Sequence, residues 1–147
     1  MKRMLVTLCA GVVIGTGTAA ATTPLPGIRS PTGNISCFLV SGGPELLLCS
    51  IAHSSYANAL QAKCMGPDGS GVDWRGFTLG PAKGAHINCT GGILYDNGKY
   101  RPSYRTLPYG TSWHRTTFTC RSRRTGVTCT NAGGHGVFIS RESYRLW

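Results

Sequence analysis

One histidine of this 147-residue chain is flanked by glycines, in Gly134-His135-Gly136, and Arg141 and Glu142 follow it closely. Glycine lets the backbone approach a bound group, and an imidazole titrates near neutral pH. His135, Arg141 and Glu142 are therefore candidates for a general acid–base site. The other interpretation is a histidine in a turn and an ordinary charge at a strand end. We favour this second interpretation, because no residue pattern fixes another catalytic partner.

Catalytic motifs with a defined spacing are absent from the sequence. It contains no HExxH zinc motif, no phosphate-binding P-loop, no GxSxG nucleophile turn and no dinucleotide fingerprint. We therefore expect no cofactor and no metal, and we lean away from an enzyme. A small secreted hydrolase, nuclease-like and using His135, stays open as the alternative.

Arginines and aromatic residues are interspersed between residues 100 and 124. The candidate binding residues are Arg115, Arg121, Arg123, Arg124 and Trp113. Arginines beside exposed rings can contact phosphates and stack on single-stranded nucleic acid, and the same mixture suits a glycan or cell-wall polymer. The alternative is a β-sheet with its arginines in water and its rings in the core. We favour this alternative, since large aromatic side chains are usually buried.

Positive charge is concentrated in the last third of the chain. Residues 99–147 contribute +8 of the net +10, from nine basic side chains and one acidic one, whereas residues 22–98 balance four basic against four acidic side chains. Such asymmetry favours an anionic partner, which is a cell-envelope polymer, a glycan or a nucleic acid. Solubility among the anionic polymers of an envelope explains the charge equally well. The oligomeric state is left open.

The first 21 residues have the pattern of a secretory signal peptide. Lys2 and Arg3 precede an apolar run over residues 4–14, and small residues follow as far as Ala21. The apolar run is about half of the roughly 20 residues that a transmembrane helix needs. We therefore expect cleavage after Ala21, no membrane span in the mature chain, and a secreted or cell-envelope location.

Removal of the signal peptide takes Cys9 with it and leaves an even number of cysteines. The six that remain are Cys37, Cys49, Cys64, Cys89, Cys120 and Cys129. An even count in an exported chain is typical of a disulfide framework. Zinc fits poorly, because structural zinc sites use closely spaced cysteine pairs. Among the many possible connectivities, we favour Cys37–Cys49, Cys64–Cys89 and Cys120–Cys129.

Short apolar runs between turn residues predict an all-β, mainly antiparallel fold, a small disulfide-crosslinked sandwich or open barrel with at most one short helix. Residues 22–29 are expected to be a leader and residues 30–147 a single domain. The helix is predicted over Ser54–Cys64, with Ser54 or Ser55 as its cap. The predicted strands include Ile35–Val40, Leu46–Ile51, Phe77–Leu79, Ala85–Thr90, Arg115–Cys120, Val127–Thr130 and Val137–Ser140, and the Asn97-Gly98 turn predicts a further hairpin.

Several short motifs of the mature chain resemble those of a family of small exported actinobacterial proteins classed as a domain of unknown function. The motifs are Gly33-Asn34-Ile35 followed by Cys37, Phe118-Thr119-Cys120, Gly126-Val127-Thr128-Cys129 followed by Asn131, Gly134-His135-Gly136, and Ile139-Ser140-Arg141 followed by Tyr144. The resemblance extends over nearly all of the mature chain. It implies export and disulfides, and it implies no activity.

Together these observations predict a secreted, basic binding or interaction protein. Its last third would face an anionic polymer of an envelope or a host.

Overall fold

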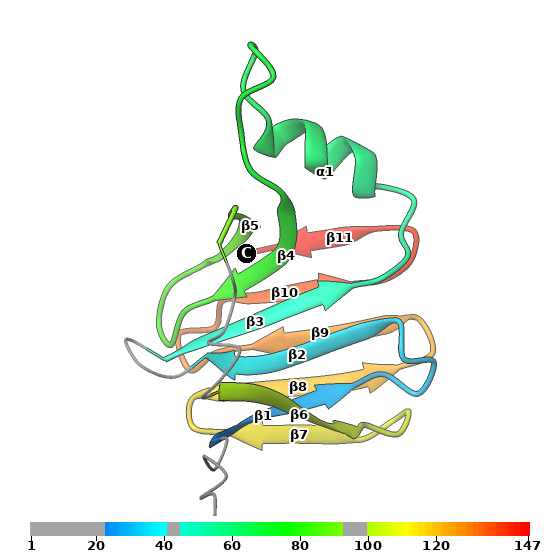
Figure 1. The fold of residues 1–147 in the computed structure, drawn as a ribbon. Helices are drawn as coiled ribbons and strands as arrows, with labels where there is room; N and C mark the ends of the chain where they lie inside the picture. Colours follow the sequence, from blue (N-terminus) through cyan, green and yellow to red (C-terminus); the bar gives the residue numbers. More distant parts are fainter. Residues whose placement is uncertain (1–22, 41–44, 93–99) are drawn as a thin grey trace, which may run out of the picture.

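The computed structural model describes residues 23–40, 45–92 and 100–147. Over these residues the chain forms two β-sheets that pack face to face, with one short helix at one end (Figure 1). The sheets do not close into a barrel. The prediction of an all-β, mainly antiparallel fold with one short helix is therefore confirmed, in its sandwich form. No helix in the described ranges is long and apolar enough to cross a membrane.

The first sheet has six strands in the order β5-β4-β3-β2-β1-β6. Their bounds are β1 (Thr23–Arg29), β2 (Ile35–Val40), β3 (Leu46–Ile51), β4 (Trp74–Leu79), β5 (Ala85–Cys89) and β6 (Tyr100–Thr106). All neighbours are antiparallel except β1 and β6, which run parallel. The helix α1 (Ala57–Cys64) follows β3 and buries Leu60 in the core between the sheets.

The second sheet is a five-stranded antiparallel meander, in the order β11-β10-β9-β8-β7. Its strands are β7 (Ser112–Arg115), β8 (Phe118–Arg123), β9 (Gly126–Thr130), β10 (Gly136–Ile139) and β11 (Tyr144–Leu146). The strands of residues 23–106 thus form one sheet and those of residues 112–146 the other. The chain passes between the two sheets once, through residues 107–111.

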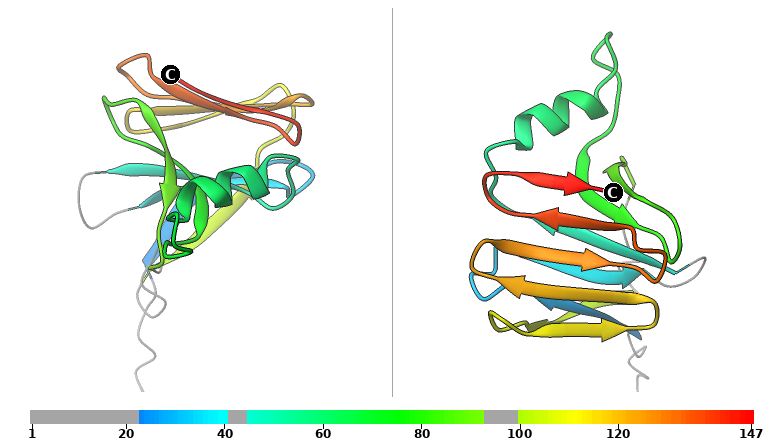
Figure 2. Two further views of the ribbon diagram at one scale, coloured as in Figure 1. Left: turned by 90° about the horizontal axis from the view of Figure 1, so that it is seen from above. Right: turned by 180° about the vertical axis from the view of Figure 1, so that it is seen from behind.

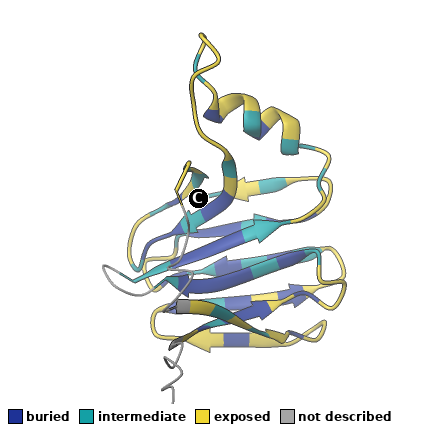
Figure 3. Ribbon diagram, in the orientation of Figure 1, coloured by how far each residue is buried: buried dark blue, intermediate teal, exposed yellow. Residues whose placement is uncertain are grey.

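The main core lies between the sheets and follows the two-residue period of the strands. On β2 and β3 the inward positions are apolar, as with Leu39 and Leu47, and on β8 and β10 they include Phe118 and Ile139, all at most 4% exposed. Buried residues occur along strands of both sheets (Figure 3), and residues of both sheets belong to one core cluster. Sequence alternation therefore explains the inward positions. The other face of the six-stranded sheet carries a smaller buried cluster of Leu25, Phe38 and Leu48.

The six predicted disulfide cysteines pair as Cys37–Cys49, Cys64–Cys89 and Cys120–Cys129. The favoured connectivity is confirmed. Two bridges join residues directly opposite each other on neighbouring strands, β2 with β3 and β8 with β9. These two bridges meet at the centre of the core, where the sulfur of Cys129 lies 3.7 Å from that of Cys37 and 3.9 Å from that of Cys49.

The segment predicted as a leader is instead strand β1, which pairs with β2 on one side and β6 on the other. The two prolines of this segment, Pro24 and Pro26, are the reason that the sequence predicts no strand here. Because they alternate, both missing N–H groups lie on the same edge of the strand, and the other edge can still pair. Leu25 and Ile28, each at most 2% exposed, anchor the strand on opposite faces of the sheet.

Two other boundaries differ from the prediction. Residues 115–120 are not one strand, because a turn at Thr116, with a positive φ of 49°, separates β7 from β8. The helix begins at Ala57 and receives no side-chain cap, since Ser55 bonds to another segment. The hairpin turn predicted at Asn97-Gly98 lies outside the described residues.

Candidate functional site

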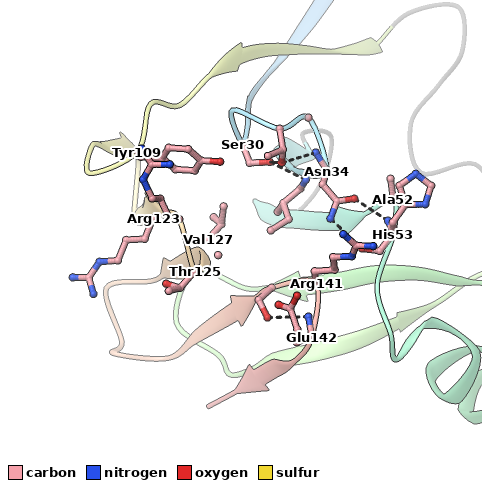
Figure 4. A pocket seen from close by; sticks show the side chains of 16 residues that line it. Ser30, Asn34, Ala52, His53, Tyr109, Arg123, Thr125, Val127, Arg141 and Glu142 are labelled. Atoms are coloured by element: carbon pink, nitrogen blue, oxygen red, sulfur yellow. Dashed lines mark hydrogen bonds between the residues drawn. The ribbon is translucent and has the colours of Figure 1, made fainter.

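Four turns at one end of the sandwich surround an opening of about 560 Å³ (Figure 4). Two turns come from the six-stranded sheet, residues 30–34 after β1 and residues 52–53 after β3. The other two come from the five-stranded sheet, residues 123–126 and residues 140–142. Tyr109, from the segment that connects the sheets, completes the lining. The opening therefore lies where both layers end.

The lining of this opening is rich in positive charge. Arg123, Arg124 and Arg141 belong to it, and Glu142 is the one acidic residue among the lining residues. All four side chains are exposed to water. Among the described residues, none of the three guanidinium groups has a carboxylate within salt-bridge distance. The arginines therefore remain available for an anionic group from outside.

The turn that carries Arg141 is held by hydrogen bonds from the opposite layer. The Ser55 N–H donates to the Arg141 carbonyl over 2.9 Å, and the Ser55 hydroxyl donates to the Glu142 carbonyl over 3.2 Å. The Tyr56 hydroxyl donates to the Ser140 carbonyl over 3.0 Å. These bonds fix the backbone at Arg141, so a ligand would meet a turn that is already ordered.

Tyr56 is itself held by an aromatic cluster. Its ring lies 5.0 Å from that of Tyr144 and 6.1 Å from that of Trp74. Burial raises the pKa of Tyr56 to about 12. The hydroxyl donates to the turn at physiological pH, where an ordinary tyrosine is also protonated, and the raised pKa extends this bond to more alkaline pH.

The opposite wall is fixed by two reciprocal bonds between the β1–β2 turn and the residues after β3. The Asn34 side-chain amide donates to the His53 carbonyl over 3.0 Å, and its oxygen accepts from the His53 N–H over 2.9 Å. Figure 4 shows the Arg141 side chain extending toward this Asn34–His53 side of the opening. Asn34, His53 and Arg141 thus meet from three different turns.

Arg124 and Tyr109 form the third side of the opening. The Arg124 guanidinium carbon lies 5.2 Å from the centroid of the Tyr109 ring, which is a cation–π contact. A backbone hydrogen bond holds the segment after Tyr109 against β8, because the Gly110 N–H donates to the Ser122 carbonyl over 2.8 Å. Arg123, in contrast, extends away from the opening (Figure 4).

The three residues considered for acid–base chemistry do not come together. Arg141 and Glu142 lie at the opening, after the end of β10, whereas His135 precedes the start of that strand. His135 belongs to a turn in which its N–H donates to the Asn131 side chain over 3.0 Å. This turn is tied to the β4–β5 connection, because the Asn131 amide donates to two carbonyls there. The hypothesis that His135 acts with Arg141 and Glu142 therefore loses its geometric support.

The candidate binding residues are also spread over the molecule. Arg121 and Arg123 lie on the outer face of β8, and Arg124 lies at the opening. Arg115 ends β7 at the opposite end of the sheet, in a second hollow with Trp113. Trp113 is 4% exposed and belongs to the core, as the structural interpretation of the sequence expected.

Sequence reasoning missed three residues of the opening, Asn34, His53 and Tyr109. Each stands in a turn, and nothing local indicates that these turns meet. The sulfur atoms of Cys37, Cys49 and Cys129 gather closely enough for a metal site, but all three are bonded in disulfides. They are therefore not free thiolate ligands.

A family model described as a family of unknown function, DUF6636, matches residues 8–147. The predicted resemblance to a family of unknown function is thereby confirmed. No curated protein and no solved structure matches the chain.

Proposed function

We propose that this chain, which belongs to DUF6636, a family of unknown function, is exported and binds an anionic polymer. The binding surface would lie on its five-stranded half. The observation that supports this proposal most directly is the opening, which Arg124 and Arg141 line from different sides, neither with an ion-pair partner among the described residues. A phosphate, sulfate or carboxylate of the polymer would enter there.

The distribution of charge supports the same proposal. The five strands β7–β11 contain no aspartate or glutamate, and Glu142 is the single acidic residue after residue 98. Residues 107–147 carry a net charge of +5, whereas residues 22–106, which are twice as many, carry +3. A concentration of charge of this kind raises the rate and the strength of association with polyanions.

Export and an envelope location are part of this proposal. The disulfides of the domain are stable in an oxidising compartment, and the amino-terminal pattern is that of a signal peptide. A polyanion-rich envelope or an extracellular matrix would supply the ligand.

The test compares two double variants of equal charge on inorganic polyphosphate. Arg124→Gln/Arg141→Gln removes two charges at the opening, and Lys63→Gln/Lys83→Gln removes two exposed charges from the other half. Affinity is measured by fluorescence anisotropy over a series of salt concentrations. Each ionic contact contributes about 0.7–0.9 to the slope of log affinity against log salt for nucleic-acid phosphates.

We expect the arginine variant to lower that slope by roughly 1.5, and the lysine variant to leave it unchanged. Equal slopes for the two variants would show that the opening is not the site. An affinity of the unmodified protein that does not respond to salt would refute polyanion binding altogether.

A further inference from the structure

The outer face of the five-stranded sheet is uncovered. In the view from behind, this sheet lies in front and no other described element crosses it (Figure 2, right). Seen from above, it forms an outer layer of the molecule, and α1 lies over the other half (Figure 2, left). This face is therefore a broad surface open to solvent.

Strand register places the outward side chains of this face in two rows. The first row crosses all five strands through Ser112, Arg121, Thr128, Phe138 and Arg145. The second row crosses four of them through His114, Thr119, Thr130 and Gly136, and it ends at Trp147, the residue after β11, which exchanges backbone hydrogen bonds with Gly136. Each row spans about 19 Å, at roughly 4.8 Å between strands.

Trp147 lies against the sheet because Gly136 has no side chain. A β-carbon at Gly136 would come within 2.6 Å of Cζ2 and 2.9 Å of Cε2 of the indole. The indole N–H donates to the Gly134 carbonyl over 3.0 Å, so the ring is fixed as well as supported. Trp147 is nevertheless 37% exposed.

A second ring lies against the sheet in the same way. A β-carbon at Gly126 would come within 2.9 Å of Cε2 of Phe138. Both glycines of this face thus accept an aromatic ring where another residue would place its own side chain. The result is a surface with two aromatic rings on the side of β10 and β11 and threonine hydroxyl groups on the neighbouring β9 and β8.

Arginines lie over and beside these rings. The Arg145 guanidinium carbon lies over the Trp147 ring, 5.1 Å from its centroid, in a cation–π contact, and Phe138 stands directly opposite Arg145 in the register. Arg121 lies in the same row, and it is exposed. The face therefore combines aromatic rings, threonine hydroxyls and unopposed positive charge.

We infer that this face binds an extended chain of an acidic polysaccharide. Aromatic rings on a flat surface pack against the apolar C–H faces of sugar rings. Hydroxyl and guanidinium groups bond to sugar hydroxyls and to carboxylates or sulfates. The inference rests on the proposed function for the charge of the ligand, and it adds the polymer class and a second binding surface.

The experiment measures the affinity of polygalacturonate, of polyphosphate and of neutral dextran for three forms of the protein. These are the unmodified mature chain, Trp147→Ala and Trp147→Phe; the last keeps an aromatic ring at the position. Circular dichroism and the melting temperature establish that each variant is folded. Single-stranded poly(U) RNA serves as a competing ligand.

We expect Trp147→Ala to weaken polygalacturonate binding by about tenfold, on the scale of one aromatic contact, and Trp147→Phe to restore most of it. Polyphosphate binding, which needs no ring, should not change with either variant. Arg121→Gln/Arg145→Gln should weaken polygalacturonate and leave the weak binding of dextran unchanged.

The other outcomes separate the two proposals. Polygalacturonate binding that depends on Arg124 and Arg141 but not on Trp147 would overturn this inference and leave the proposed function standing. Trp147-dependent binding that is equally strong for dextran, without polyphosphate binding, would refute the proposed function and the acidic nature of the ligand. Poly(U) binding that is as strong as that of polygalacturonate and equally dependent on Trp147 would identify a nucleic acid instead.

Discussion

Two disulfides touch at the centre of the core, and from this contact we predict how much the free energy of unfolding falls when one or both of them are removed. Cys37–Cys49 closes a loop with a sequence separation of 12 residues, and Cys120–Cys129 one of 9 residues. In the loop-entropy description, each such bridge stabilises the folded state by about 3 kcal/mol. Replacing both cysteines of a bridge with alanine also leaves a cavity in the core, on the order of 1 kcal/mol. We therefore expect each double-alanine variant to lose about 4 kcal/mol.

Removing both bridges should cost less than the sum of the two losses. The sulfur of Cys129 touches both Cys37 and Cys49, at 3.7 and 3.9 Å, so the first removal already breaks these contacts and opens part of the shared cavity. Coupled neighbours of this kind deviate from additivity by about 0.5–3 kcal/mol. Cys64–Cys89 is the matched control, because Cys89 lies on β5, two strands or roughly 10 Å from β3.

The assay is urea unfolding of all single and combined bridge variants, followed by fluorescence and extrapolated linearly to water. Sucrose can be added equally to every sample if the combined variant is too unstable on its own. Additive losses for the two central bridges, within about 0.3 kcal/mol, would show that their contact contributes nothing. Coupling of Cys37–Cys49 to Cys64–Cys89 as strong as that to Cys120–Cys129 would also refute the reasoning, since it would point to a general effect of crosslinks.

Three further predictions concern the framework of the opening and the core. Because the pKa of Tyr56 is raised to about 12 in the folded protein from 10.0, its stabilising contribution is complete below pH 10 and is lost as the pH rises through 12. Allowing for the partial exposure of this residue to solvent, the loss is about 1 kcal/mol. Tyr56→Phe should remove this pH dependence in urea titrations at pH 9 to 12, and an unchanged dependence would assign it to another group. Gly76→Ala should destabilise the protein by several kcal/mol, whereas Gly69→Ala should cost only about 1 kcal/mol. Both glycines have a positive φ, but a β-carbon at Gly76 alone would collide with the Cys49 carbonyl. Equal melting temperatures for the two variants would contradict this assignment. Asn131→Ala should cost about 2 kcal/mol, since it removes two bonds of 2.8 and 2.9 Å to the β4–β5 connection, and a loss below about 0.5 kcal/mol would show that these bonds are replaced by water.

Local patterns predicted most of the strands. The runs Ile35–Val40 and Leu46–Ile51 form strands with the predicted bounds, because alternation and turn residues determine both ends of each run. The disulfide pairing followed from placing two cysteine pairs on hairpins. The prediction failed at residues 23–29, where pairing with a distant strand, β6, outweighed the local effect of two prolines. It also failed at Thr116, because a turn without glycine or proline gives little signal.

The candidate site was predictable only in part, because it depends on contacts between segments far apart in the sequence. Charge counting identified the basic last third, which includes Arg124 and Arg141. It could not show that Asn34 and His53 face Arg141, since their turns belong to the other sheet and precede Arg141 by 107 and 88 residues of chain. His135 attracted attention because glycines flank it, and those glycines instead serve a turn and the packing of Trp147.

Because the chain passes between the sheets once, the domain consists of two packed halves that are joined by one short linker. Both crosslinks of the first half and the crosslink of the second lie within their own halves, so in the described part of the chain no covalent connection other than residues 107–111 joins the layers. That short tether holds the halves at an effective concentration on the order of millimolar or more. A protease cut there would convert an intramolecular docking into a bimolecular equilibrium, and the integrity of the opening, which draws its walls from both halves, would then depend on protein concentration.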